Sequence, residues 1–158
     1  MFFEAIRDKV KAVKKIPDRL DIITKRALRP LAGQIAELNQ EQLKKGMRSD
    51  GSFLPDYSKR SVEEFGKPEG PIKLFDTGDF YKGINPVFDA SGFTLQGKDS
   101  KTEYLQNGGG GNFSNEFGFT GTEFRGYGED ILGLTDRSVF EIGTEAIGQI
   151  QYELKKEL

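Results

Sequence analysis

One stretch decides the fold: Leu74-Phe-Asp-Thr-Gly-Asp-Phe-Tyr-Lys-Gly-Ile84. Asp76 or Thr77 can cap a short turn, and Gly78 can adopt the positive φ that such a turn requires. The apolar members of the stretch are expected in the core: Leu74, Phe80 and Ile84. The stretch is therefore predicted to be the structural entry into a sheet.

Strand-like sequence follows this stretch as far as Phe124. Short apolar or aromatic groups alternate there with turn residues, and they include Gly83–Phe88, Gly92–Gln96 and Asn115–Thr120. This alternation predicts three to four antiparallel strands. Gly108–Gly111 is expected to form a flexible loop, since a glycine cradle for phosphate would follow a strand, open a helix and often supply a lysine.

Helical periodicity occupies the rest of the chain. Apolar residues recur every three or four positions from Phe3 to Ile16 and from Leu20 to Leu43, which predicts amphipathic helices. Pro17 either ends or bends the first helix, and Pro30 either kinks the second or begins a new one. Gly46 is a natural C-terminal cap.

The last helix is predicted to begin after Thr135, a good N-cap, with Asp136 in its first turn. Its apolar stripe would consist of Leu134, Val139, Ile142, Ala146, Ile150 and Leu154. A shorter helix is expected at Ser61–Phe65, where Ser61 and Glu64 could form a weak capping box.

The order of these elements predicts a single α+β domain over residues 1–158, because the strands are consecutive and no helices alternate with them. Its expected parts are a helical region (1–46), a long loop (47–71), an antiparallel sheet with a Gly-rich loop (72–126) and a C-terminal helical region (127–158). At 158 residues, one domain is the default.

The amino-acid composition excludes several kinds of catalytic and metal-binding site. The chain has no cysteine and no histidine, which removes disulfides, thiol nucleophiles, Ser-His-Asp triads and the usual zinc sites. We predict no catalytic, cofactor-binding or metal-binding residues. The sequence contains no run approaching the ~20 apolar residues of a membrane span, so no membrane contact is expected.

Charge is unevenly distributed. Residues 1–48 hold 12 Lys and Arg against 6 Asp and Glu, whereas the remainder holds 11 against 19. A basic beginning could contact nucleic acid or an acidic protein surface, or could simply be a solvated helix face. No aromatic residues are interleaved with these lysines, so specific nucleic-acid binding is not predicted.

Two further motifs flank the opening stretch. Asp50-Gly51 precedes it, followed by Phe53-Leu-Pro55 and Tyr57-Ser58, and Ile131-Leu-Gly-Leu-Thr-Asp136 comes before the last helix. In this order the motifs resemble those of the tail-completion and neck proteins of tailed bacteriophages, including the Mu-like virion morphogenesis and minor tail component families. Phe80 stands where that family usually has leucine. The family motif residues are Asp50, Gly51, Leu74, Asp76, Thr77, Gly78, Phe80, Ile84, Leu132, Gly133, Leu134, Thr135 and Asp136.

The resemblance implies a structural virion protein and not an enzyme. Such a subunit would be made in the host cytoplasm and would form a homo-oligomeric ring in the neck or tail of the particle. Its partners would be the portal or connector and the tail proteins. Genomic DNA would pass through the lumen without sequence-specific binding.

Two alternatives come from other classes of protein. One is a carboxylate-based, glycosidase-like hydrolase, for which Asp76, Asp79, Glu116 and Glu123 are the candidate acids and bases. An aspartic protease is not predicted from Asp76-Thr-Gly78, because that chemistry needs a second such motif or a symmetric dimer. The other alternative is a monomeric adaptor that binds partners along its sheet edge.

Overall fold

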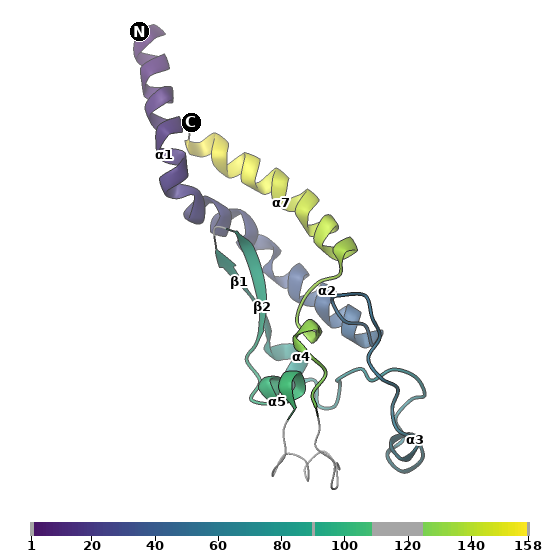
Figure 1. The fold of residues 1–158 in the computed structure, drawn as a ribbon. Helices are drawn as coiled ribbons and strands as arrows, with labels where there is room; N and C mark the ends of the chain where they lie inside the picture. The colour runs from purple at the N-terminus through teal and green to yellow at the C-terminus, as the bar shows by residue number, and fades with distance from the viewer. Residues whose placement is uncertain (1, 90, 109–124, 158) are drawn as a thin grey trace.

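The protein is elongated, with a long helical spine that carries a β-hairpin on one side and the last helix on the other (Figure 1). The computed structural model describes residues 2–89, 91–108 and 125–157. Its elements are α1 (Phe2–Leu28), η1 (Arg29–Leu31), α2 (Ala32–Lys44), α3 (Lys59–Phe65), α4 (Asp79–Gly83), β1 (Ile84–Asp89), β2 (Gly92–Gly97), α5 (Thr102–Asn107), η2 (Glu129–Ile131) and α7 (Asp136–Glu157).

The spine consists of α1, the short 3₁₀ turn η1, and α2. Pro17 does not end the first helix, which continues through it to Leu28. A proline removes only one helical hydrogen bond, and the apolar stripe continues on both of its sides. Pro30 lies in η1, where the missing N–H matters little, and the turn leads directly into α2.

The predicted cap at Gly46 is confirmed. Gly46 has a φ of 71°, and its N–H donates to the carbonyl of Leu43 at 2.8 Å, while the N–H of Met47 donates to that of Gln42 at 3.1 Å. This pair of bonds is a Schellman motif. An added Cβ at Gly46 would lie 2.5 Å from Cβ of Pro71, so glycine is also required here by close packing.

The prediction of three to four strands is wrong. The described residues form a sheet of two antiparallel strands, β1 and β2, paired from Ile84↔Gly97 to Asp89↔Gly92. In the described part of the chain no third strand follows β2, because the chain turns into α5, whose Thr102 packs directly against Gly97. The predicted strand Asn115–Thr120 lies outside the described residues. The broad α+β class still holds.

Two contiguous clusters of buried side chains form the core. One joins η1 and α2 to α7, and the other joins the end of α2 to the Leu74–Ile84 stretch and η2. The first contains Leu28, Leu31, Ile35, Leu134, Ile142 and Ala146, and the second contains Leu43, Leu54, Phe80, Tyr81, Ile84 and Ile131.

The long loop is held to the body at several points. The N–H of Leu54, a buried residue, donates to the carbonyl of Gly46 at 2.7 Å, and an isolated bridge pairs Asp56 with Pro71. The short helix α3 begins two residues earlier than predicted, because Ser58 and not Ser61 caps it: Oγ of Ser58 accepts from the N–H of Ser61 at 3.1 Å.

The predicted terminal amphipathic helix is confirmed as α7, which runs back along α1 (Figure 1). Ile142 and Ala146 are buried as expected, but Val139 from the same predicted stripe is exposed. Glu157 near the end of α7 pairs with Arg19 and with Arg26, which fixes α7 against the middle of α1. No helix among the described residues is long and apolar enough to cross a membrane.

Candidate functional site

The Leu74–Ile84 stretch is a turn that enters the sheet, as predicted. Gly78 has a φ of 85°, and the one-turn helix α4 follows it and leads into β1. Phe80 and Ile84 are buried, and Leu74, although only partly buried, packs against the same cluster. The stretch therefore contributes turn chemistry and core packing.

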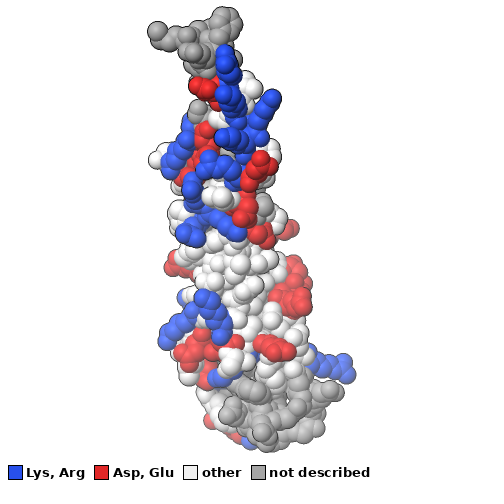
Figure 2. Space-filling view, turned by 90° about the vertical axis from the view of Figure 1, so that its left-hand side faces the viewer, with Lys and Arg blue, Asp and Glu red and all other residues white. Residues whose placement is uncertain are grey.

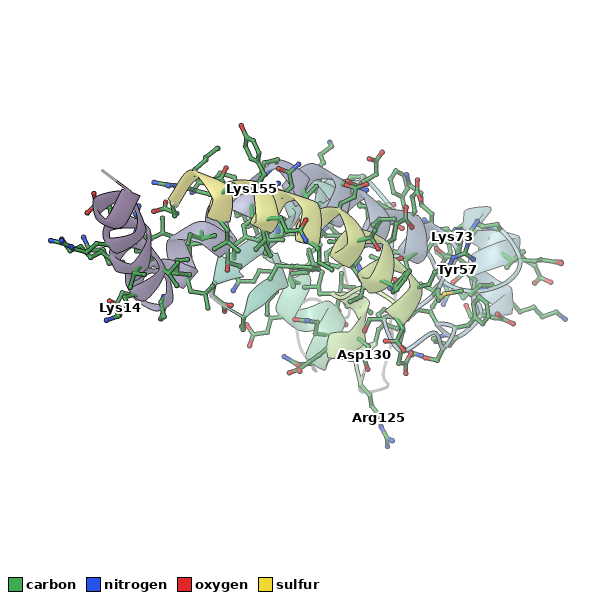
Figure 3. All side chains as sticks on the ribbon, turned by 90° about the horizontal axis from the view of Figure 1, so that it is seen from above. Lys14, Tyr57, Lys73, Arg125, Asp130 and Lys155 are labelled. Carbon is green, nitrogen blue, oxygen red and sulfur yellow. The ribbon has the colours of Figure 1, made fainter. Side chains whose placement is uncertain are left out.

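A network of polar contacts fixes the beginning of this stretch. The phenol of Tyr81 donates to the carbonyl of Lys73, and the N–H of Lys73 donates to the phenol oxygen of Tyr57 at 3.2 Å. Tyr57 and Lys73 lie together at the end of the molecule opposite to Lys14 (Figure 3). Burial raises the pKa of the Tyr81 phenol, so it is a hydrogen-bond donor at neutral pH.

The carboxylates of the stretch are exposed and do not form an acid/base pair in a pocket. Asp76 forms an ion pair with Lys67 at 3.7 Å, and Oδ2 of Asp79 accepts from Oγ1 of Thr77 at 2.6 Å. The bond from Thr77 holds the pKa of the Asp79 carboxyl below its usual value, which is the opposite of what a general acid needs.

The other two candidate acids of the hydrolase alternative, Glu116 and Glu123, lie outside the described residues. Two surface hollows of the described part are lined by other residues than Asp76 and Asp79. No group of three or more carboxylates there could hold a metal ion.

The Asp50-Gly51 motif and the element before α7 lie against each other. The N–H of Ser49 donates to the carbonyl of Asp130 at 2.8 Å, and a Cβ added to Gly133 would lie 2.8 Å from Cβ of Ser49. Gly51 has a φ of 82°, which the turn requires. The structure thus brings together two motifs that are some 80 residues apart in sequence.

Arg48 and Asp50 stabilise this contact. The guanidinium of Arg48 donates to the carbonyl of Tyr127 at 3.0 Å and to that of Phe53 at 2.9 Å. Oδ1 of Asp50 accepts from the N–H of Ser52 at 2.8 Å, and the hydrogen bonds from Ser52 lower the pKa of the Asp50 carboxyl. All these bonds join groups within the chain, so the Asp50-Gly51 motif determines the conformation of its own loop.

The Leu132–Asp136 element is anchored by two residues of α2 that the sequence pattern did not reveal. Nδ2 of the fully buried Asn39 donates to the carbonyl of Gly133 at 2.7 Å and to that of Ile131 at 3.2 Å. Gln42 donates to Gly133 at 3.2 Å and accepts from the N–H of Thr135 at 3.0 Å. The sequence does contain one signal for Asn39. It follows Ile35 by four residues, which places a polar side chain on the buried side of the helix.

Two apolar features mark the described surface around the long helices. Exposed apolar side chains lie on the N-terminal half of α1 and on the outer side of α7: Val10, Val13, Leu20, Val139, Phe140 and Ile147. A hollow of about 450 Å³ lies between β2 and the start of α7, lined by Gly92, Phe93, Leu95, Leu134 and Val139 among others.

Charge separates along the molecule. On the face seen in Figure 2, lysines, arginines and acids crowd the end formed by α1, whereas the middle is largely uncharged. Helix α1 contains eight Lys and Arg against four Asp and Glu, and α7 contains three against five. One helix is thus basic and the other acidic.

Comparisons of the chain with protein-family models, with curated proteins and with solved structures found no match. A functional assignment therefore stands on the sequence motifs and on the geometry described above.

Proposed function

We propose that this chain is a structural virion protein of a tailed bacteriophage, a ring-forming neck or tail-completion subunit that joins the portal or connector to the tail. Copies would contact one another head to tail around an axis, because contacts between two different surfaces generate rings when the rotation closes. The genome would pass through the lumen without sequence-specific contacts, and the subunit would reside in the virion.

The observation that carries this proposal is a set of large apolar side chains that the described part of the chain leaves exposed. On the two long helices they are Val10, Val13, Leu20, Val139, Phe140 and Ile147. The protein is elongated, with these two helices along its length (Figure 1). Exposed apolar surface of this kind marks places where other molecules bind, and a ring subunit needs such surfaces for its two neighbours.

The use of the motif residues also supports a structural role. The Leu74–Ile84 entry and the Leu132–Asp136 element pack against the end of α2, and Ser49, next to the Asp50-Gly51 turn, bonds to Asp130. They define the shape of the subunit, and none of them presents a polar group into a cavity. Motif residues that determine shape in this way suit a component of an assembly, whose function depends on how its surfaces fit those of its neighbours.

The decisive experiment measures mass. The purified chain would be examined by light scattering or mass photometry, alone and with the portal or connector of its phage, and cryo-electron microscopy of the virion would locate it. We expect either a closed ring in solution or a ring on the connector. A monomer that binds neither connector nor tail, and that purified virions lack, would refute the proposal. A monomer that instead binds an extended peptide along β2 would favour the adaptor.

A further inference from the structure

Strand β2 has a free edge within the described part of the chain. The described sheet has two strands, so β1 occupies one edge of β2 and leaves the other open. The hollow beside β2 is lined by the successive residues Ser91–Leu95, and its facing wall comes from Leu132–Leu134 and Val139. Because successive side chains of a strand point to opposite faces, a hollow that touches all of them lies along the edge.

The hydrogen bonds of the hairpin identify the backbone groups at this edge. Just outside the ladder, the N–H of Lys98 donates to the carbonyl of Gly83 at 2.9 Å. Bonded and non-bonded pairs alternate along an antiparallel ladder, so every second residue before Lys98 also bonds to β1. The residues between them, Leu95 and Phe93, therefore direct their N–H and C=O groups away from β1. Neither residue forms a backbone hydrogen bond with any other described segment.

Pro86 agrees with this assignment. It stands opposite Leu95 in the register and has no N–H to give to the ladder. Proline is tolerated in a strand where its nitrogen faces away from the partner strand, which is what the alternation requires for this pair. Pro86 also blunts the outer edge of β1, and that strand already lies against α1 and α2.

Strand β2 lacks the devices that usually protect a free edge from pairing. Such edges commonly carry a charged side chain, a proline or a bulge. The sequence of β2, Gly92-Phe-Thr-Leu-Gln-Gly97, contains no charge and no proline, and its register with β1 is regular over all six residues. No described residue that lines the hollow is charged. The edge is therefore open, uncharged and suited to pairing.

We infer that β2 accepts an extended segment of another polypeptide as a third strand. An extended backbone offers donors and acceptors at the same spacing as the N–H and C=O groups of Phe93 and Leu95, which is how strands are added to sheet edges. A helix keeps its own backbone groups bonded within itself, so it would leave these groups unpaired. The unpaired backbone of β2 is thus what selects a strand as the occupant.

The lining of the hollow defines the side chains of this segment. Phe93 and Leu95 are partly buried against the core cluster that contains Leu134, whereas Thr94 between them is exposed. An added strand would continue this alternation, with apolar side chains toward Leu134 and Val139 and polar ones outward. The volume of about 450 Å³ lies within the ~300–1,000 Å³ of ligand pockets. The expected partner is an uncharged extended segment in which every second residue is apolar.

The paired stretch would be short. Towards the end of β2, Gly97 already packs against Thr102 of α5, so the free edge is confined to Phe93 and Leu95. The inference does not depend on the ring. In a virion, the segment would belong to a neighbouring protein of the particle.

The test uses a synthetic strand as the probe. A blocked peptide that alternates Thr and Val, with a Gly-Ser-Lys-Lys tail for solubility, is titrated into the full chain and followed by NMR of the backbone amides. We expect the amide signals of Phe93 and Leu95 to shift, and their hydrogen exchange to slow at least tenfold, because both N–H groups gain acceptors. The control peptide has the same sequence with every Thr and Val N-methylated, so that it cannot donate, and it should not bind.

A matched pair of variants tests the hollow. Val139 is 48% exposed on its wall, and Val87 is 40% exposed on β1, outside the residues that line it. Val139→Lys should weaken peptide binding at least tenfold, because the added strand would cover the new charge. Val87→Lys should leave the affinity within about twofold, since its charge stays in solvent. Circular dichroism of both variants should match that of the wild type.

The inference is wrong if the strand peptide leaves the Phe93 and Leu95 amides unchanged at millimolar concentration, or if the N-methylated peptide binds as tightly. A peptide with helical apolar spacing that fills the hollow in preference to the strand peptide would also overturn it. Rings that do not bind the strand peptide would refute this inference and leave the proposed function standing. A chain that binds the peptide but is absent from virions would do the reverse.

Discussion

Replacing Asn39 by alanine tests whether the contact between α2 and the element before α7 holds the fold together. The side chain is fully buried, and its amide donates to the carbonyls of Ile131 and Gly133 at 3.2 and 2.7 Å. The substitution removes both bonds and leaves a buried carbonyl at Ile131 without this donor. Gly133 keeps the bond from Gln42 at 3.2 Å, so its loss is partial.

The expected cost follows from these bonds. Two hydrogen bonds contribute a net ~0.5–1.5 kcal/mol each, and a buried carbonyl left without a partner costs ~1–3 kcal/mol. These terms add up to about 2–6 kcal/mol, and part of the loss is offset because the substitution also removes the buried Oδ1 of Asn39, which accepts no hydrogen bond from the described residues. We therefore expect Asn39→Ala to lower the free energy of unfolding by about 2–4 kcal/mol, which corresponds to a fall in Tm of roughly 5–15 °C. A domain of this size has only ~5–15 kcal/mol in total, so the variant would be close to unfolding.

Urea denaturation followed by circular dichroism at 222 nm measures this difference, at a concentration where the wild type is monomeric. The control is Glu37→Ala, an exposed position on the same helix two residues earlier, which should stay within ~0.5 kcal/mol of the wild type. If Asn39→Ala is as stable as Glu37→Ala, the amide does not anchor the segment, and the account of this contact is wrong.

Three further outcomes are expected. Gly133→Ala should destabilise the chain by ~1–3 kcal/mol, because its Cβ would lie 2.8 Å from Cβ of Ser49, and Ser49→Gly should restore most of that loss in a double-mutant cycle. In Thr77→Val the pKa of Asp79 should rise toward its ordinary value, as followed by NMR titration, since the donor at 2.6 Å is gone; an unchanged pKa would contradict this cause. Burial raises the pKa of Tyr127 to about 12, so the unfolded chain loses this proton first and stability falls as pH rises from about 10 through 12; denaturation series above pH 10 should show a smaller fall in Tyr127→Phe.

The helices and the hairpin could be predicted from sequence because their signals are local. Apolar residues at helical spacing located α1, α2 and α7, and Gly46 located the end of α2. The expected strands Gly83–Phe88 and Gly92–Gln96 agree closely with β1 and β2. Each of these elements is specified by residues within a few positions of one another, which is what periodicity measures.

The number of strands and the anchoring of α7 depend on packing contacts that hydrophobic periodicity does not encode. Thr102 packs against Gly97, and the chain then forms α5 where further sheet was expected. Asn39 meets its partner Ile131 only 92 residues further on. Because a polar residue within an apolar stripe counts as an exception to the pattern, periodicity alone does not reveal that it is buried and bonded.

The glycines of the chain show which surfaces the fold explains and which it does not. At Gly83 and Gly133, an added Cβ would lie within 3 Å of atoms from other segments, so internal packing requires their small size. Gly33, Gly143 and Gly148 have no such neighbour among the described residues, although glycine inside a helix costs ~1 kcal/mol relative to alanine. Gly143→Ala should therefore raise the free energy of unfolding by about 1 kcal/mol, measured by urea denaturation. A variant that is no more stable than the wild type would mean that the fold itself requires glycine at this position.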